Sequence, residues 1–124
     1  MHLLKQLLFC FFLFADGCLF AQELTGWTKL KSPTNETLRR LYFVDANNGW
    51  AVSLGGKIIN TTDSGNNWNI QNSTVSTPIV DIFFINPNRG WALTYPSEPP
   101  FGTSILKTTD GGERWVKDSV FFQN

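Results

Sequence analysis

Short apolar runs separated by polar turns follow one another along most of the chain. Residues 41–44 and 79–85 are apolar and rich in β-branched and aromatic side chains. Runs of this length, bounded by turn residues, are typical of strands buried on both faces. No stretch after residue 21 has the 3.6-residue period of a helix. The pattern therefore predicts an all-β protein.

Turn signals stand between these runs. Residues 45–49 and 86–90 are rich in Asn, Asp, Pro and Gly, and each segment leads into a tryptophan. We expect both segments to reverse the chain. Gly55-Gly56 predicts a tight hairpin that leads into a strand over residues 57–60. Residues 105–107 are the matching strand further along the chain.

Two landmarks recur in the same order. Gly-Trp-Ala occurs at residues 49–51 and 90–92, and Thr-x-Asp-x-Gly-x-x-Trp occurs at residues 61–68 and 108–115. The second copy is longer because residues 96–102, rich in proline, have no counterpart in the first. A repeat of about 40–50 residues suits a four-stranded propeller blade.

The repeat predicts about two four-stranded antiparallel β-propeller blades, over residues 38–71 and 79–118. Trp27 and the three residues after it align with the segments that begin at Trp68 and Trp115. We therefore expect one leading strand before the first blade. Residues 22–124 are expected to form part of a larger propeller.

The Thr-x-Asp-x-Gly-x-x-Trp motif is explained by a stabilised turn. An aspartate at the start of a turn accepts hydrogen bonds from backbone N–H groups ahead of it. Glycine supplies a positive φ, threonine bonds across the turn, and tryptophan covers it with an apolar surface and one donor. The residues expected in these structural roles are Thr61, Asp63, Gly65, Trp68, Thr108, Asp110, Gly112 and Trp115.

These residues match the Asp-box, also called the BNR repeat, of β-propellers. The wider pattern, F-x-(D/N)-x-x-x-G-W-A followed by G-x-I-x-x-T-x-D-x-G-x-x-W, resembles the photosystem II assembly/stability factor-like family of Asp-box propellers. The resemblance covers about residues 24–124. One departure is that Asn67 and Arg114 stand where many Asp-boxes have threonine. The resemblance implies a scaffold that helps to assemble protein partners; the residues themselves show no pigment, quinone or photosystem contact.

Residues 1–21 have the pattern of a secretory signal peptide. Lys5 precedes an apolar core over residues 7–14, and small residues lead to Gln22. Cleavage after Ala21 is the favoured interpretation; cleavage before Cys18, which would give a lipoprotein, fits less well because Asp16 lies near the site. The apolar run is too short for a transmembrane span. The sequence therefore predicts an exported protein that is periplasmic, at the cell surface or secreted.

Composition excludes several kinds of chemistry. Both cysteines, Cys10 and Cys18, and the single histidine, His2, lie within the predicted leader. Residues 22–124 therefore lack the groups for disulfides, catalytic triads and common zinc sites, so no metal or cofactor is expected. The formal net charge is zero and there is no basic run, which argues against a nucleic-acid partner.

Two blades are few for this architecture. A closed propeller has about four to eight blades. The chain could be the amino-terminal part of a longer protein, could close a ring with copies of itself, or could persist as an open arc with exposed blade edges that self-associate. The first explanation is favoured, because residues 120–124 begin with an apolar run that resembles the approach to another inner strand.

Four charged residues are candidates for partner binding, and each has a simpler alternative. Arg40 and Asp81 fall at the same register of the two inner strands, where they would line the central channel or form a salt bridge between blades, the latter being favoured. The remaining candidates are Arg39 and Arg89. Residues 96–102 could be a binding loop or a longer hairpin. Trp50 and Trp91 could stack on sugars, but their repetition favours the blade core.

An enzymatic function is not expected. Sialidases also contain Asp-boxes, but their catalysis needs an arginine cluster, a tyrosine nucleophile and acidic partners. Residues 22–124 contain few of these groups, namely Arg39, Arg40, Arg89, Arg114, Tyr42 and Tyr95. The sequence predicts a non-catalytic protein-binding or assembly scaffold. The alternative is a glycan-acting or cell-surface adhesive propeller whose functional residues lie beyond this sequence.

Overall fold

The computed structural model describes residues 27–95 and 102–118. The chain divides into two units, Met1–Leu30 and Lys31–Asn124, and every described strand lies in the second. The predicted signal peptide, residues 96–101 of the proline-rich insertion and the apolar run that begins at residue 120 fall outside the described residues. No described helix is long and apolar enough to cross a membrane.

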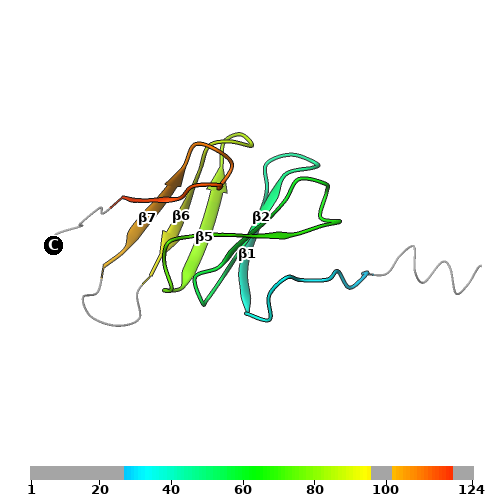
Figure 1. Ribbon diagram of the computed structural model, residues 1–124, viewed down its shortest axis with the longest axis horizontal. Coiled ribbons are helices and arrows are strands. Elements are labelled where there is room, and N and C mark those ends of the chain that lie inside the picture. Colours follow the sequence, from blue (N-terminus) through cyan, green and yellow to red (C-terminus); the bar gives the residue numbers. More distant parts are fainter. Residues whose placement is uncertain (1–26, 96–101, 119–124) are drawn as a thin grey trace, which may run out of the picture. The chain divides into compact units, whose positions relative to one another are not determined.

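The described strands form two four-stranded antiparallel sheets, each in simple chain order (Figure 1). These sheets are called blade 1 and blade 2. The strands of blade 1 are β1 (Leu38–Phe43), β2 (Gly49–Ser53), β3 (Ile58–Thr61) and β4 (Asn69–Gln71). Those of blade 2 are β5 (Ile79–Phe84), β6 (Gly90–Thr94), β7 (Ser104–Thr108) and β8 (Val116–Asp118). The all-β prediction is confirmed, and the outer limits of the sheets coincide with those of the two sequence repeats.

The Gly-Trp landmark has a packing explanation in the first hairpin of each blade. Phe43 pairs with Gly49 across β1 and β2, and Phe84 pairs with Gly90 across β5 and β6. A Cβ atom on either glycine would come within 2.6 Å of the opposite phenyl ring. Each ring therefore lies over its glycine, which leaves no space for a side chain there.

The turns follow the chemistry expected from the sequence. Asp45 Oδ1 accepts hydrogen bonds from the backbone N–H groups of Asn47 and Asn48, and Asn86 Oδ1 accepts the equivalent pair in blade 2. The β2–β3 hairpin closes through Ser53 N donating to Lys57 O at 2.9 Å. Its Gly56 has a φ of 86°, a left-handed conformation that glycine adopts without steric cost.

The hydrophobic core lies between the two blades. The Trp50 indole stacks on the Phe84 ring with 3.5 Å between ring centroids, and Trp115 meets the same ring edge-on at 5.9 Å. Val52, Ile58 and other aliphatic side chains fill the space around them. Tyr42 Oη donates a hydrogen bond to Phe84 O at 2.9 Å. Trp50 is thus a core residue of the blade pair and is not free to stack on a sugar.

The expectation that the first strand of each blade is buried on both faces was wrong for both β1 and β5. Most of β1 is exposed, β5 alternates between buried and exposed positions, and β2 is buried throughout. Blade 2 packs against one side of β1 only, so Leu41 and Phe43 on its other side remain exposed.

The predicted leading strand is absent, because residues 27–30 have no regular secondary structure. By the repeat, this segment corresponds to β4, the outermost strand of blade 1. Such a strand forms by pairing with the third strand of its own blade, as β4 pairs with β3. The residues that would supply that third strand lie outside the described residues.

Candidate functional site

The Asp-box of blade 1 is a turn held by one threonine and one aspartate. Thr61 Oγ1 donates to Asp63 Oδ1 at 2.8 Å and accepts from Gly65 N at 2.9 Å. Asp63 Oδ1 accepts from Asn67 N at 2.8 Å, and Asp63 Oδ2 accepts from Asn67 Nδ2 at 2.7 Å. Asn67, which stands where many Asp-boxes have threonine, therefore adds a side-chain hydrogen bond to the turn. Trp68 Nε1 donates to Gly65 O and closes the turn.

The Asp-box of blade 2 repeats these contacts but uses its tryptophan differently. Thr108 Oγ1 donates to Asp110 Oδ1 and accepts from Gly112 N, both at 2.8 Å. Asp110 Oδ1 accepts from Arg114 N at 2.9 Å. Trp115 Nε1 donates to Gln71 Oε1 of blade 1 at 3.4 Å. This box therefore contributes to the contact between the blades as well as to its own turn.

Both boxes keep their aspartates ionised and committed to the turn. The side-chain hydrogen bond from Asn67 is the largest cause that lowers the pKa of Asp63 below its ordinary value. For Asp110 the main cause of the lowered pKa is the backbone N–H of Arg114. A general acid in glycoside cleavage needs the opposite, a raised pKa. Neither aspartate is placed for that role.

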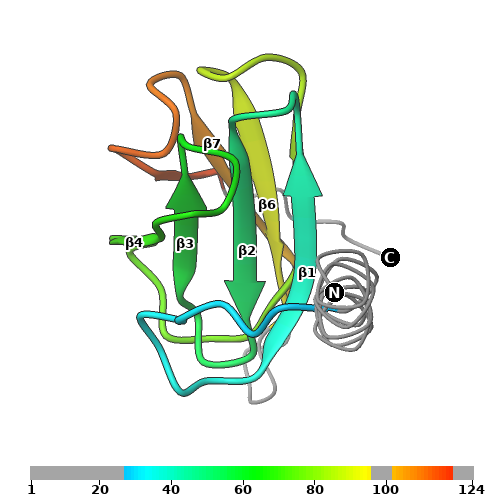
Figure 2. The ribbon, with the colours of Figure 1, turned by 90° about the vertical axis from the view of Figure 1, so that its right-hand side faces the viewer.

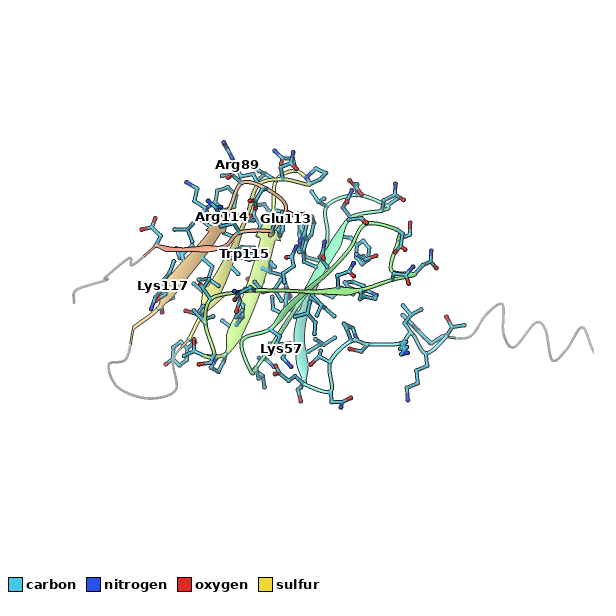
Figure 3. All side chains as sticks on the ribbon, viewed as in Figure 1. Lys57, Arg89, Glu113, Arg114, Trp115 and Lys117 are labelled. Atoms are coloured by element: carbon cyan, nitrogen blue, oxygen red, sulfur yellow. The ribbon has the colours of Figure 1, made fainter. Side chains whose placement is uncertain are left out.

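The charged candidates of the inner strands lie in different places. Arg40 Nε lies 3.1 Å from Asp81 Oδ1, with more than half of each side chain exposed, so the two residues form a surface ion pair between blades. Such a pair contributes about 0–1 kcal/mol. Arg39 is exposed at the neighbouring position of β1. Arg89 lies in the β5–β6 turn, and Arg114 lies in the β7–β8 turn at the same end of blade 2 (Figure 3). Lys57 lies toward the opposite end, in blade 1.

A cleft separates the outer strands of blade 1 from the Asp-box of blade 2, and we call it the inter-blade cleft. Its volume is about 580 Å³. Blade 1 contributes Asn60 from β3 and residues 69–72 of β4 and its end, and blade 2 contributes residues 110–113. Figure 3 shows Glu113 and Trp115 on the side of blade 2 that faces blade 1. Gln71 Nε2 donates to Gly111 O at 2.9 Å and braces the cleft across its base.

The cleft residues were not singled out by the sequence, apart from Trp50, Asp110 and Gly112. They are brought together by two blades that diverge outward, which no local pattern reveals. One signal was available. Asn60 and Asn69 stand where the second repeat has Lys107 and Val116, so the repeated fold does not account for these carboxamides.

The described residues offer little for catalysis. They contain no group of three or more His, Cys, Asp or Glu side chains able to hold a metal ion. The carboxyls with a shifted pKa are all shifted downward by hydrogen bonds, at Glu36, Asp45, Asp63 and Asp110. A lowered pKa means that the carboxylate stays ionised, so none of these four groups is a proton donor at neutral pH.

The paired landmarks, the blade topology and the two turns define an Asp-box β-propeller. The chain belongs to the family described as photosynthesis system II assembly factor YCF48, which matches residues 20–117. A solved structure described as "YCF48 bound to D1 peptide" is similar, with a TM-score of 0.66 and 27% sequence identity. The similarity covers 79% of this chain and 30% of that chain, so this chain spans under a third of its relative. No curated protein matches the chain.

Proposed function

We propose that this chain is a non-catalytic protein-binding module that acts as a scaffold in assembly. The similar solved protein, YCF48, was determined with a bound D1 peptide. That observation carries the proposal, because it shows a propeller with this repeat in a complex with a peptide.

The site chemistry supports a binding function over an enzymatic one. The Asp-box carboxylates are consumed by turn contacts, and Arg40 is paired with Asp81. What the described surface offers instead is a polar cleft on a rigid pair of sheets. Rigid frames with exposed polar groups suit recognition, since little ordering entropy is lost on binding.

We further propose that the module is exported. This rests on the sequence pattern of residues 1–21, with its apolar core ahead of Ala21. Fusion of residues 1–30 to alkaline phosphatase, which is active only after export, would test it in a bacterial host. Activity lost on replacing Leu7 and Leu8 by Asp is expected; activity retained in that variant contradicts export by this segment.

Binding of the D1 peptide is the direct test of the proposed function. We expect saturable binding of a fluorescent D1 peptide to the purified chain, measured by anisotropy, and weaker binding of a scrambled peptide of the same composition. Equal binding of the two peptides, or no binding of either, contradicts the proposal. Sialoside hydrolysis assayed on the same sample would instead point to the glycan-acting alternative.

A further inference from the structure

The inter-blade cleft has a lining suited to main-chain recognition. Carboxamide side chains dominate it, and among its lining residues there is no lysine or arginine. A carboxamide carries both a donor and an acceptor, as does a peptide unit. The carboxamide residues that line the cleft are Asn48, Asn60, Asn69, Gln71, Asn72 and Asn88.

Two of these carboxamides, Asn60 and Asn69, are not explained by the fold. Asn60 and Asn69 are cross-strand partners, and Trp50 pairs with Asn60 on the other side, so one row runs from the buried core out to the cleft. The Trp50 counterpart in blade 2 is also a tryptophan, but the counterparts of Asn60 and Asn69 are Lys107 and Val116. Trp50, at the core end of the row, is therefore repeated in blade 2, whereas Asn60 and Asn69, toward the cleft, are particular to blade 1.

The cleft also borders the free edge of a sheet. Consecutive residues 69–72 all line it, although alternate side chains of a strand point to opposite faces. The edge of β4, together with the face that carries Asn69, therefore borders the cleft. β4 is the last strand of its sheet, so its outer N–H and C=O groups have no strand partner in the described residues. Such an edge can pair with an added extended peptide.

The charges of the cleft lining limit which peptides it can bind. Asp110 and Glu113 line the blade 2 side of the cleft. Asp110 is held by its turn contacts and lies within reach of the Arg114 charge, so Glu113 is the carboxylate left for a ligand. With Glu113 and no cation in the lining, an acidic segment is disfavoured relative to a basic one. The cleft therefore favours a neutral or basic segment.

We propose that the inter-blade cleft binds an extended, neutral or basic peptide along the β4 edge, with Asn60 and Asn69 contacting its main chain. This inference rests on the proposed protein-binding function and names a site for it. Asn72, directly after β4, and Glu113 of blade 2 also line the cleft. Gln71 is a brace, because its side chain is already bonded to Gly111 and Trp115.

The test uses fluorescent peptides of about eight residues, long enough to cross the cleft as one strand. Valine alternates in them with Lys, Gln or Glu. We expect the wild-type chain to bind the Lys and Gln peptides and to bind the Glu peptide about tenfold more weakly. The double variant Asn60→Ala/Asn69→Ala should lose about tenfold in affinity for the Lys peptide. Glu113→Lys should reverse the preference between the Lys and Glu peptides.

A matched control is available in the second repeat. Lys107→Ala/Val116→Ala changes the counterpart positions, both exposed and outside the cleft lining. It should leave binding unchanged. An equal loss of affinity for the Lys peptide in both double variants, when the two are equally stable in urea, overturns the proposal. Binding of neutral oligosaccharides in place of peptides also overturns it.

Hydrogen exchange separates this inference from the proposed function. Binding in the cleft should slow exchange of the amides at residues 69–72. If the D1 peptide binds but these amides exchange as in the free chain, the binding function stands and the cleft is not its site. If the panel peptides bind the cleft but the D1 peptide does not, the cleft proposal stands without that partner.

Discussion

At the scale of single residues, the Asp-box depends on a threonine hydroxyl as much as on its aspartate. Thr61 and Thr108 are almost fully buried, and each hydroxyl both donates to the aspartate and accepts from a glycine N–H. A buried polar group left without its partner costs about 1–3 kcal/mol. The threonine is therefore fixed by hydrogen bonding inside a closed turn.

Replacement of Thr108 by valine tests this role. Thr108→Val keeps the shape of the side chain but leaves Gly112 N and Asp110 Oδ1 without the hydroxyl, so we expect a loss of about 1–3 kcal/mol in the free energy of unfolding. Urea denaturation measures it. Thr109→Val, at the exposed neighbouring position, is the control and should change stability by less than about 0.5 kcal/mol. Equal effects in the two variants would contradict a specific role for the buried hydroxyl.

The lowered pKa values of Asp63 and Asp110 predict a loss of stability in acid. Their ordinary value is 3.8, which applies to the unfolded chain, and the folded values lie below it. As the pH falls through 3.8, the unfolded chain binds protons first, so stability is complete above that range and declines toward the folded pKa values. Thermal unfolding between about pH 6 and pH 3 measures the decline.

A double variant isolates the contribution of these two carboxylates. Asp63→Asn/Asp110→Asn removes both titrating groups, so its melting temperature should vary less with pH over the same range. The variant will be less stable at neutral pH, because the ionised acceptors are lost. An unchanged pH dependence would show that the acid sensitivity arises at Glu36 or Asp45, whose pKa values are also lowered.

At the scale of elements, the first hairpin of each blade tolerates no side chain at its glycine, but the two blades should differ in cost. The Phe84 ring over Gly90 is 1% exposed and stacked on Trp50, whereas the Phe43 ring over Gly49 is 39% exposed. We expect Gly90→Ala to destabilise by about 1–3 kcal/mol, because the confined ring cannot move aside. Gly49→Ala should cost less, and urea denaturation compares them. Equal costs would mean that the hairpin backbone, and not the ring, sets the requirement.

Much at this scale could be predicted from the sequence, because the repeat carries it. The Gly-Trp landmarks and the two Asp-boxes set strand order, turn positions and the limits of both sheets. Burial could not be predicted in the same way. Leu41 and Ile82 occupy equivalent positions, yet Leu41 is 58% exposed and Ile82 is 2% exposed, since only one has a blade packed over it. The inter-blade cleft was missed for the same reason, as it depends on two elements together.

At the scale of the whole second unit, no further blade of the described residues covers either outer face of the blade pair, and we call these the open faces. On the blade 1 side Ala51 and Ile59 are nevertheless buried. Figure 2 looks onto the open face of blade 1, where Leu41, Phe43 and Ile70 are exposed. The open face of blade 2 has a shallow cavity of about 210 Å³ between Trp91, Leu93 and Ile105. These are the counterparts of Trp50, Val52 and Ile58, which are covered between the blades. Each open face therefore repeats one side of an interface that the chain already forms.

We expect the purified chain to self-associate through these faces as concentration rises. Leu41→Ser/Phe43→Ser removes apolar surface from one face and should lower the average mass measured by light scattering. Leu54→Ser, at an exposed apolar residue of the β2–β3 turn, is the control and should leave the mass unchanged. A monomeric wild-type chain at all concentrations would contradict the prediction.

The hydrogen bonds between the blades have a consequence for how such proteins change in length. Trp50 Nε1 and Gln71 Nε2 both donate to Gly111 O, and Tyr42 Oη donates to Phe84 O. In these three contacts the earlier blade supplies the donor side chain and the later blade only a main-chain carbonyl, which every residue carries. A duplicate of blade 1 could therefore follow blade 1 without compensating substitutions at these accepting positions. Blade 2 keeps only the Trp50 counterpart among the three donors, because Phe83 and Asp118 stand at the positions of Tyr42 and Gln71. Duplication of blade 1 therefore preserves these three contacts, whereas duplication of blade 2 does not.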